Sequence, residues 1–454
     1  MTNKLFIFLS ILIVALALFL RLYKIENRAP FDWDQNRDYT VISGIAAGKA
    51  TLIGPIAKGE GGFFLGPLYY YLATPAYIML HGSPLALPIT SVVIDVITIA
   101  VILITLRKLI GDWPALSLAT IWAFSWFAIE MSRISWNVSL VPLWSIIILW
   151  LLSQRSPLSI SKVGLLGFVV GLSWHIHAAL IPISLIILMI NWRVWAKNLS
   201  YIAMLVTCYL IALIPLILFD LRHSGLNFHL LTQIFTASVH VSASYLELIT
   251  SVLMRFGKNT QNILLGISSY QIFLGSAFAL LAGISLVFDR GIYRLSGLII
   301  ILNIFAVIAL KEIGFPEYYL AVSYLPTLII FIRIISYLTK SNQSFLIIIT
   351  LILLFLNTRK YEFSETSFSL SRKVSVAKSI IDLDAPVDLR LIMAPGREGG
   401  IKAFYKLYGG KLDTSSPLKV IVTDQSGGPI IEGGELATDI GNFGGIRVAK
   451  IVVE

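Results

Sequence analysis

The sequence predicts an all-α protein that crosses a membrane many times and ends in a small α/β domain. The first observation is composition: of 454 residues, 57% are hydrophobic and 13% are charged, against about 25% charged in ordinary soluble domains. The second is a series of about eleven apolar stretches, each near the length of a spanning helix. The third is a change of pattern after Arg359, where short alternating apolar segments replace the long apolar ones.

The transmembrane part is predicted to cover residues 1–357. A spanning helix needs about 20 predominantly apolar residues, with roughly 17–25 usual. By that length, the candidate spans are 4–22, 84–106, 113–131, 138–153, 163–176, 178–194, 199–220, 270–288, 295–311, 318–338 and 344–357. The stretches 163–176 and 178–194 form either two spans or one broken unit. Arg21-Leu-Tyr-Lys24 follows the first span without a small-residue cleavage site, which favours a membrane anchor over a signal peptide.

Two long outer loops, 23–83 and 223–268, interrupt the series of spans. The first contains an apolar run that is short and includes Pro75, which indicates an interfacial helix rather than a span. Beyond the spans, residues 358–454 are predicted to form the small α/β domain. Its expected strands are 387–393, 418–422 and 446–453, and its expected helices are 375–381 and 401–407. We find no chemical motif in it.

The formal net charge of +10 is explained most simply by short cytoplasmic loops, which retain Lys and Arg in membrane proteins. Nucleic acid is therefore not expected as a partner. If Met1 is cytoplasmic, the inner loops are basic, and an odd number of spans places the C-terminal domain outside the cytoplasm. We expect a multi-pass protein of the plasma (inner) membrane, with the lipid bilayer around it. The single Cys208 excludes an internal disulfide.

Five polar clusters are predicted at outer span ends: F-D-W-D-Q-N-R-D-Y (31–39), S-R-I-S-W-N (132–137), H-I-H (175–177), F-D-L-R-H (219–223) and K-E-I-G-F-P-E-Y-Y (311–319). Each cluster alone is equally well explained as a solvated helix end. Together they place acids, histidines and arginines on one face, which favours a shared outward-facing site. The nucleotide-binding and hydrolase patterns G-x-x-x-x-G-K-[ST], H-E-x-x-H and G-x-S-x-G are absent.

These clusters resemble motifs of the GT-C glycosyltransferases, especially the protein O-mannosyltransferase and lipid A aminoarabinose transferase group (family 39-like). The acidic run at 31–39 resembles the D-E-x-R-Y signature of the first outer loop in that group. The run G-P-L-Y-Y-Y-L at 66–72 resembles the K-P-P-L-Y-Y-W-L segment that follows the signature. W-N-V-S-L-V-P-L at 136–143, the H-I-H cluster and P-E-Y-Y-L-A-V-S-Y-L-P at 316–326 are similar to further family features, so the resemblance covers about residues 1–357.

The resemblance implies a membrane glycosyltransferase that moves a sugar from a polyprenyl-phosphate carrier to a lipid, protein or glycan acceptor outside the cytoplasm, with inversion. Asp34 would be the catalytic base, because it matches the family's first-loop aspartate when Arg37 is matched to the motif's Arg. Asp32 would support it. A carboxylate within reach of the acceptor hydroxyl takes its proton, and fixed cations stabilise the departing phosphate. The expected substrate-binding residues are Arg37, Arg133, His177, Arg222, Lys311 and Tyr318.

The expected donor is the carrier-linked sugar, and no further cofactor is assigned. Asp32 and Asp34 form a D-x-D pair, a pattern that holds a divalent metal in soluble sugar-nucleotide enzymes. A carrier with a single phosphate has less need of a metal, so metal is not favoured. His177 is either a substrate-binding residue or a packing residue, because a lone buried histidine more often has a packing role. The side chains of His175 and His177 alternate in direction, so at most one of them faces the site.

Two positions depart from the family pattern. Gln35 replaces the second acid of D-E, which puts any carboxylate role at that position in doubt. Phe64-Leu65-Gly66 precedes Pro67, so the Lys of K-P-P-L is missing and its phosphate contact must come from elsewhere.

Asp95 lies in mid-span, where a charge is unfavourable. It either pairs with another span or lies on the path of the lipid phosphate, and we favour the structural partner.

The main alternative function is a polytopic membrane transporter or lipid flippase. Transporters place their sites near the bilayer midplane and often contain repeats that relate two halves. The sequence contains no such repeat, and its polar clusters lie at one face. A third hypothesis, a non-catalytic subunit that presents the C-terminal domain, does not explain the acids of the first loop.

Overall fold

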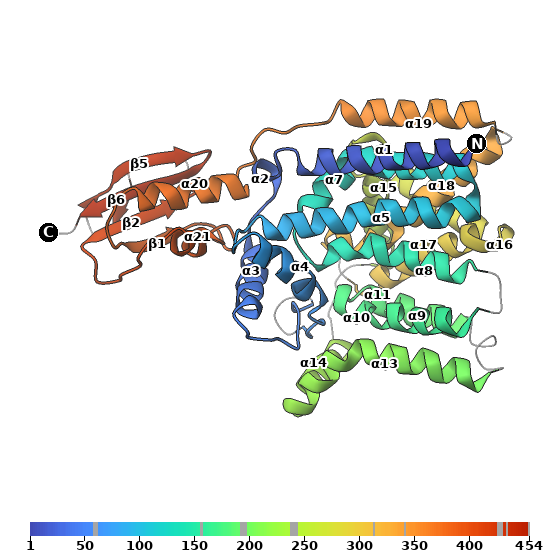
Figure 1. The fold of residues 1–454 in the computed structure, drawn as a ribbon, viewed down its shortest axis with the longest axis horizontal. Helices are drawn as coiled ribbons and strands as arrows, with labels where there is room; N and C mark the ends of the chain where they lie inside the picture. Colours follow the sequence, from blue (N-terminus) through green and yellow to red (C-terminus); the bar gives the residue numbers. More distant parts are fainter. Residues whose placement is uncertain are drawn as a thin grey trace.

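The computed structural model describes residues 1–57, 62–154, 158–190, 198–236, 244–311, 314–339, 342–424, 430–432 and 435–452. Most of the described chain forms a bundle of helices, and the C-terminal residues form a smaller mixed unit beyond one end of it (Figure 1). The N-terminus lies at the opposite end of the bundle. A helical protein with a small C-terminal sheet was expected, and the structure confirms this fold class.

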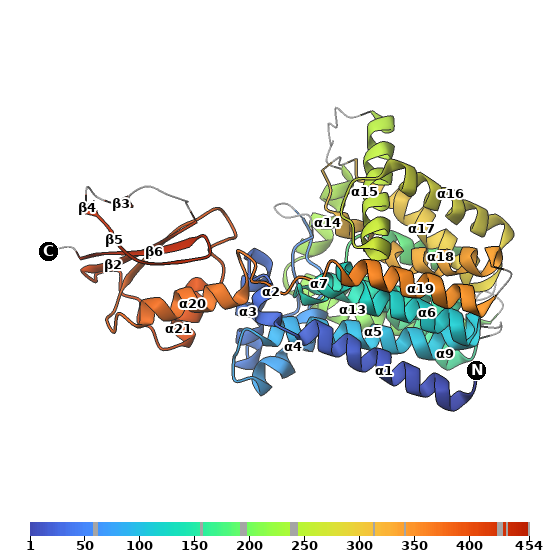
Figure 2. The same cartoon turned by 90° about the horizontal axis from the view of Figure 1, so that it is seen from above.

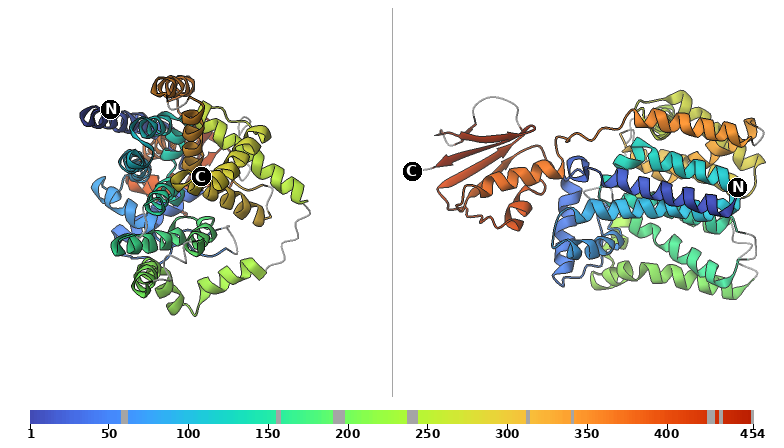
Figure 3. Two further views of the ribbon diagram at one scale, coloured as in Figure 1. Left: turned by 90° about the vertical axis from the view of Figure 1, so that its right-hand side faces the viewer. Right: turned by 45° about the horizontal axis from the view of Figure 1, so that its top comes forward.

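The helices of the bundle follow the apolar stretches of the sequence, with differences at the ends. They are α1 (Asn3–Leu22), α5 (Ala86–Ile110), α6 (Asp112–Phe124), α7 (Trp126–Arg133), η1 (Asn137–Leu140), α8 (Val141–Leu152), α9 (Ile160–Gly171), α10 (Ser173–Ile176), α11 (Leu180–Ile190), α13 (Leu199–Arg222), α16 (Ile272–Phe288), α17 (Gly291–Ala309), η2 (Glu317–Ser323), α18 (Tyr324–Leu338) and α19 (Gln343–Thr358). The two views in Figure 3 show that these helices run roughly side by side.

Five of the described helical segments are long and apolar enough to cross a membrane: Asn3–Leu22, Ala86–Ile110, Leu199–Arg222, Gly291–Ala309 and Glu317–Leu338. The number rises to six if α6 and α7, which bend by 59° at Ser125, count as one span. The remaining apolar helices are shorter, at 10–17 residues. The expected count of eleven spans is therefore not confirmed, although a multi-pass membrane protein is supported.

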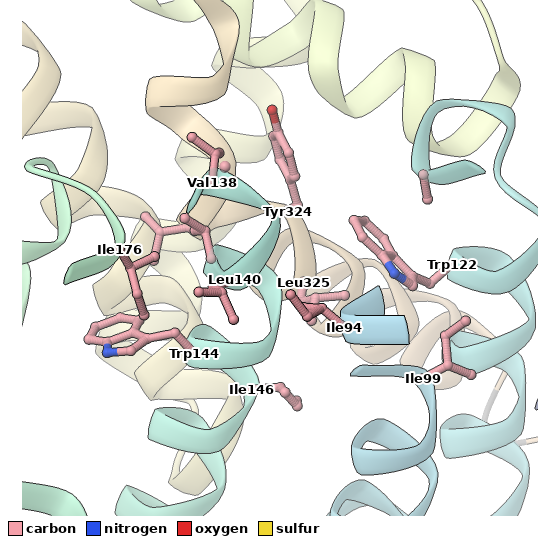
Figure 4. Packing of buried hydrophobic residues seen from close by; sticks show 14 of the residues in the cluster. Ile94, Ile99, Trp122, Val138, Leu140, Trp144, Ile146, Ile176, Tyr324 and Leu325 are labelled. Carbon is pink, nitrogen blue, oxygen red and sulfur yellow. The ribbon is translucent and has the colours of Figure 1, made fainter. Parts of the chain in front are cut away.

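Apolar side chains from many parts of the chain meet in the middle of the bundle (Figure 4). Trp122 of α6, Trp144 of α8 and Tyr324 of α18 are all buried there, together with Ile94 of α5. Arg21 of α1 is also buried, and its Nε donates to Asp95 Oδ2 at 2.6 Å. Trp122 Nε1 donates to the other oxygen of Asp95 at 2.9 Å. Asp95 is therefore the structural partner of another helix, as favoured from the sequence.

The described part of the long loop at 23–83 contains three helices: α2 (Ile25–Arg28), α3 (Trp33–Ala46) and α4 (Leu68–Met79). They lie at the end of the bundle that faces the C-terminal unit (Figure 1). Pro75 lies inside α4, which has only 12 residues. The second long loop is also largely helical, with α14 (Leu226–Thr236) and α15 (Tyr245–Leu265). A capping box of Ser244 and Glu247 begins α15, and Gly266 in the left-handed conformation ends it.

The C-terminal unit contains α20 (Leu370–Ile381), α21 (Ile401–Leu407) and a four-stranded sheet. Its strands are β1 (Asp388–Ile392), β2 (Leu418–Thr423), β5 (Thr438–Phe443) and β6 (Ile446–Val452), in the order β1-β2-β6-β5. Strand β1 is parallel to β2, and the other neighbours are antiparallel. Both helices cover one face of the sheet (Figure 2), and β3 (Ile431–Glu432) and β4 (Glu435–Leu436) form a separate pair. The domain boundary after residue 357 remains a prediction.

The C-terminal unit is joined to the loop at 23–83 by backbone hydrogen bonds. Leu370 N donates to Ala29 O at 2.9 Å, and Thr366 N donates to Asn27 O at 2.9 Å. Phe31 N donates to Phe368 O at 3.3 Å. The segment that leads into α3 is thus held by the segment that leads into α20.

Candidate active site

The acidic helix α3 begins with a cap that explains one departure from the family motif. Gln35 Oε1 accepts a hydrogen bond from the backbone N–H of Asp32 at 3.0 Å, and Gln35 Nε2 donates to Ser135 O at 3.1 Å. An amide can accept and donate at once, whereas an ionised carboxylate can only accept. Gln35 therefore ties the start of α3 to the end of α7, which a glutamate at this position would not do in its charged form.

The first two turns of α3 carry a chain of three charged side chains. Arg37 Nη1 donates to Asp34 Oδ1 at 2.8 Å, while Arg37 Nε and Nη2 donate to Asp38 Oδ1 at 2.8 and 2.7 Å. The Asp38 side chain is 1% exposed and that of Asp34 is 49% exposed. Asp34 is therefore the accessible acid of the group, and Asp38 is the buried acid that orients Arg37.

Burial and charge oppose each other in this group. Burial raises the pKa of Asp38 to about 6, although Arg37 acts in the opposite direction. Burial alone would lower the pKa of Arg37, but the charges of Asp38, Tyr70 and Asp34 raise it above its ordinary value. The Arg37 guanidinium lies between the side chains of Asp34 and Asp38.

Aromatic side chains from other segments lie close to Asp34. The Tyr318 hydroxyl of η2 is within electrostatic range of the Asp34 carboxylate. The Tyr318 ring meets the Trp136 ring edge to face at 4.7 Å between centroids, and the His177 ring at 5.7 Å. Asn137, next to Trp136, donates to Ile176 O at 2.5 Å. Residues from three of the sequence clusters are thus brought together with the acidic helix.

The 3₁₀ segment that carries Tyr318 is fixed from the side of α15. Lys258 Nζ lies 2.7 Å from Glu317 Oε1, and Asn259 Nδ2 donates to Glu317 O at 3.0 Å. Asn303 Nδ2 donates to Tyr319 O at 3.0 Å. These contacts from α15 were not expected from the sequence, because α15 lies within the segment 223–268 that was predicted to be a loop.

The two histidines of the H-I-H cluster face different surroundings, as their alternation predicted. His177 lies against Tyr318 and Tyr319, with ring centroids 5.7 and 5.2 Å away. His175 Nε2 is 2.7 Å from Ala212 O, and its ring packs against Gly66, where a Cβ atom would lie 2.1 Å from Nδ1. Gly66 thus provides the space that His175 occupies, and His177 is the histidine beside the candidate site.

Arg133, Arg222 and Lys311, three of the expected substrate-binding residues, have different positions. Arg133 is 1% exposed and donates to Glu130 at 2.7 Å and to the backbone oxygens of Leu20, Arg21 and Tyr23. It is a packing residue between α1 and α7, and it is not among the groups around Asp34. Arg222, at the end of α13, and Lys311, after α17, are exposed.

Asp32 forms an ion pair with a lysine of the C-terminal unit, and this contact was not expected from the sequence. Lys373 of α20 is fully buried, and its ammonium donates to the backbone oxygens of Phe31 and Gly399 and lies 3.2 Å from Asp32 Oδ1. Burial lowers the pKa of Lys373, and the Asp32 charge opposes this shift. One signal was available: Lys373 lies on the apolar face of its helix, where the other buried positions are Leu370, Val376, Ala377 and Ile380.

The described residues contain no group of three or more histidines, cysteines, aspartates or glutamates that could hold a metal ion. Asp32 and Asp34, the D-x-D pair, are bound to Lys373 and Arg37 respectively. These two acids therefore have different protein partners.

No protein-family model and no curated protein sequence matches the chain. Among solved structures, it is similar to ArnT from Cupriavidus metallidurans bound to undecaprenyl phosphate, with a TM-score of 0.50 and 11% identity over 97% of both chains. The apo form of ArnT gives a TM-score of 0.49. The oligosaccharyltransferase of Archaeoglobus fulgidus gives 0.46 at 14% identity, over 90% of this chain and 58% of that one.

The fold assignment rests on the comparison with undecaprenyl-phosphate-bound ArnT. At 11% identity the likeness concerns the fold, and its coverage includes both the helical bundle and the C-terminal unit. The sequence motifs and the structure therefore agree on the architecture. The chain has the GT-C fold.

Proposed function

We propose that the chain is a membrane glycosyltransferase that transfers a sugar from a polyprenyl-phosphate carrier to an acceptor outside the cytoplasm, with inversion at the anomeric carbon. The observation that carries the proposal is an accessible carboxylate, Asp34, beside a guanidinium, Arg37, at the end of the bundle. The fold adds support, since the similar ArnT structure contains undecaprenyl phosphate, a lipid of the carrier class.

In the proposed reaction, Asp34 is the general base. Arg37 binds Asp34 Oδ1, and within the described chain this leaves Oδ2 available to the acceptor hydroxyl. The acceptor oxygen attacks the anomeric carbon, the bond from that carbon to the phosphate oxygen breaks, and the hydroxyl proton passes to Asp34. The lipid phosphate departs with the bonding electrons, so a nearby fixed cation stabilises it.

The other proposed roles follow from position. Arg222 and Lys311 are exposed cations for the carrier phosphate. Arg37 orients Asp34, Tyr318 is within electrostatic range of Asp34, and His177 packs against Tyr318. Asp32 supports the start of α3. Arg133 is omitted from the proposal because its donors are already bound within the protein.

Binding of the carrier lipid tests the proposal directly. The purified protein in nanodiscs is expected to form a one-to-one complex with undecaprenyl phosphate, as observed by native mass spectrometry. The double variant Arg222→Ala/Lys311→Ala is expected to bind it more weakly, because each lost cation removes a charge-assisted contact. Arg290→Ala is the matched control, since Arg290 is exposed but begins α17 at the other end of the bundle.

A protein that forms no complex with undecaprenyl phosphate would contradict the proposal. Movement of that lipid between leaflets, without transfer of any sugar, would favour the flippase alternative instead.

The orientation of the chain is a separate prediction. A phosphatase that is active only outside the cytoplasm is expected to be active when fused after Glu454, because the basic inner loops favour a cytoplasmic N-terminus. The same phosphatase inserted after Gln154, in a predicted inner loop, is the control and is expected to be inactive. The opposite pattern of activities would place Asp34 on the cytoplasmic side.

A further inference from the structure

A cavity lies beside the acidic helix, between α3 and the C-terminal unit. Its volume is about 200 Å³, and its walls come from Trp33 and Asn36 of α3, from Leu391 of β1 and from the segment 396–403. Pockets for drug-sized ligands span roughly 300–1,000 Å³. The size of this cavity therefore suits a single small ring rather than a large ligand.

The walls of the cavity are fixed by specific contacts. Gly400 N donates to Asn36 Oδ1 at 3.0 Å, and the buried Lys373 joins Gly399 O to Asp32. The glycine segment approaches α3 so closely that a Cβ atom on Gly399 would lie 2.8 Å from Asp32 O. Gly400 has φ +86°, a conformation that favours glycine. The loop from the C-terminal unit is thus shaped to fit against the start of α3.

The lining offers three kinds of contact. The Trp33 side chain is 66% exposed, although its edge packs beside Gly396. Glu398 also lines the cavity, and its carboxylate is within electrostatic range of the buried Lys373 ammonium. Lys402 is exposed at the rim of the cavity. An aromatic face, a hydrogen-bond acceptor and a hydrogen-bond donor therefore surround one small space.

These contacts fit a sugar ring. The C–H face of a sugar packs on an aromatic ring, while its hydroxyl groups both donate and accept hydrogen bonds. A free phosphate would meet the Glu398 carboxylate, and an acyl chain would remove the charged groups from water without forming hydrogen bonds to them.

The cavity and the proposed catalytic acid involve the same helix, α3. Trp33, Asn36 and Arg37 are separated by three and four residues in α3, so they share one side of the helix. Arg37 in turn binds Asp34 at 2.8 Å. A sugar held against Trp33 and Asn36 would therefore lie on the side of α3 that also carries Arg37, the partner of the proposed base.

We propose that this cavity is a carbohydrate subsite that holds a sugar ring of the acceptor. The inference rests on the proposed function and narrows its acceptor from a lipid, protein or glycan to a molecule that contains carbohydrate. It also gives the C-terminal unit a role, since most of the residues that line the cavity belong to this unit.

The test uses the full-length protein in nanodiscs without sugar-based detergent. The probes are the methyl glycosides of glucose, mannose and N-acetylglucosamine, and their binding is followed by saturation-transfer NMR. At least one glycoside is expected to bind saturably. Trp33→Ala and Lys402→Ala are each expected to weaken that binding by about two- to tenfold, the effect of losing about 0.5–1.5 kcal/mol.

Two matched variants serve as controls. Lys406→Ala removes a second exposed lysine of α21 that does not line the cavity, and Tyr245→Ala removes an exposed aromatic ring of α15. Both are expected to bind the glycosides as the unchanged protein does. Gel filtration of every variant establishes that it remains folded.

Absence of saturable binding, or equal binding by Trp33→Ala, Lys402→Ala and the controls, would overturn the subsite. Binding of an unglycosylated serine- and threonine-containing peptide at the same place, lost in Trp33→Ala, would also overturn the carbohydrate assignment. Undecaprenyl phosphate binding is measured in the same samples. A protein that binds this lipid but no glycoside retains the proposed function and loses only the subsite.

Discussion

Replacement of Asp34 by asparagine is expected to reduce sugar transfer by about 10²–10⁴-fold, the usual contribution of a general base. Asparagine has nearly the same size and still accepts a hydrogen bond from Arg37, but it cannot take a proton from the acceptor. The side chain is 49% exposed, so the fold tolerates the change. Single-turnover transfer from a polyprenyl-phosphate sugar is the measurement, with carrier binding expected to persist.

Asp32→Asn is the matched control for this experiment. Asp32 lies two residues away, and its carboxylate is bound to the buried Lys373 rather than to Arg37. It is expected to lose less activity, because its role is to hold the start of α3. A larger loss for Asp32→Asn than for Asp34→Asn would transfer the role of base to Asp32.

Removal of the Asp95 carboxylate is expected to lower the free energy of unfolding by about 3–5 kcal/mol, the range for a buried ion pair that loses one partner. Asp95→Ala would leave the Arg21 guanidinium, whose side chain is 0% exposed, without its counter-charge inside the bundle. Trp122 Nε1 would lose its acceptor as well. The midpoint of unfolding in a titration with sodium dodecyl sulfate measures the change.

Two further variants isolate the cause of that loss. Asp112→Ala breaks the ion pair between Asp112, whose side chain is 23% exposed, and Arg107, whose side chain is 28% exposed. This change is expected to shift the midpoint of unfolding only slightly. Arg21→Met/Asp95→Leu replaces both charges with apolar groups and is expected to recover most of the stability. A double variant as unstable as Asp95→Ala would show that lost packing, rather than an unpaired charge, causes the effect.

The local features of the fold were predictable from the sequence. The helix expected at 401–407 is α21, and the strands expected at 387–393 and 418–422 are β1 and β2 within one residue at each end. Strand β5 was missed because Thr438–Phe443 carries a register shift between Asp439 and Gly441, which breaks the alternation of apolar residues. The bend at Ser125 was also not predicted, because hydropathy indicates the length of an apolar stretch but not a change in the direction of the helix axis.

The candidate site was predictable only where its contacts are local. Asp34 and Arg37 are three residues apart on one helix, so their ion pair follows from helix geometry. The Arg133 side chain points inward because it donates to carbonyl groups of α1, more than 100 residues earlier. The residues next to Arg133 in the sequence therefore do not predict its direction. The contact from Lys373 to Asp32 joins residues 341 positions apart, which explains why a lysine on an apolar helix face remained uninterpreted.

The pairing of residues 27–31 with residues 366–370 has a consequence for biosynthesis. The segment before α3 leaves the ribosome early, but its backbone partners are made about 340 residues later. At a synthesis rate of about 5–20 residues per second, this delay lasts on the order of 20–70 seconds. During that time the acidic helix lacks both its backbone partners and Lys373. Ribosome-bound and prematurely terminated chains that stop before residue 366 therefore contain the acidic helix without the contacts that hold its start.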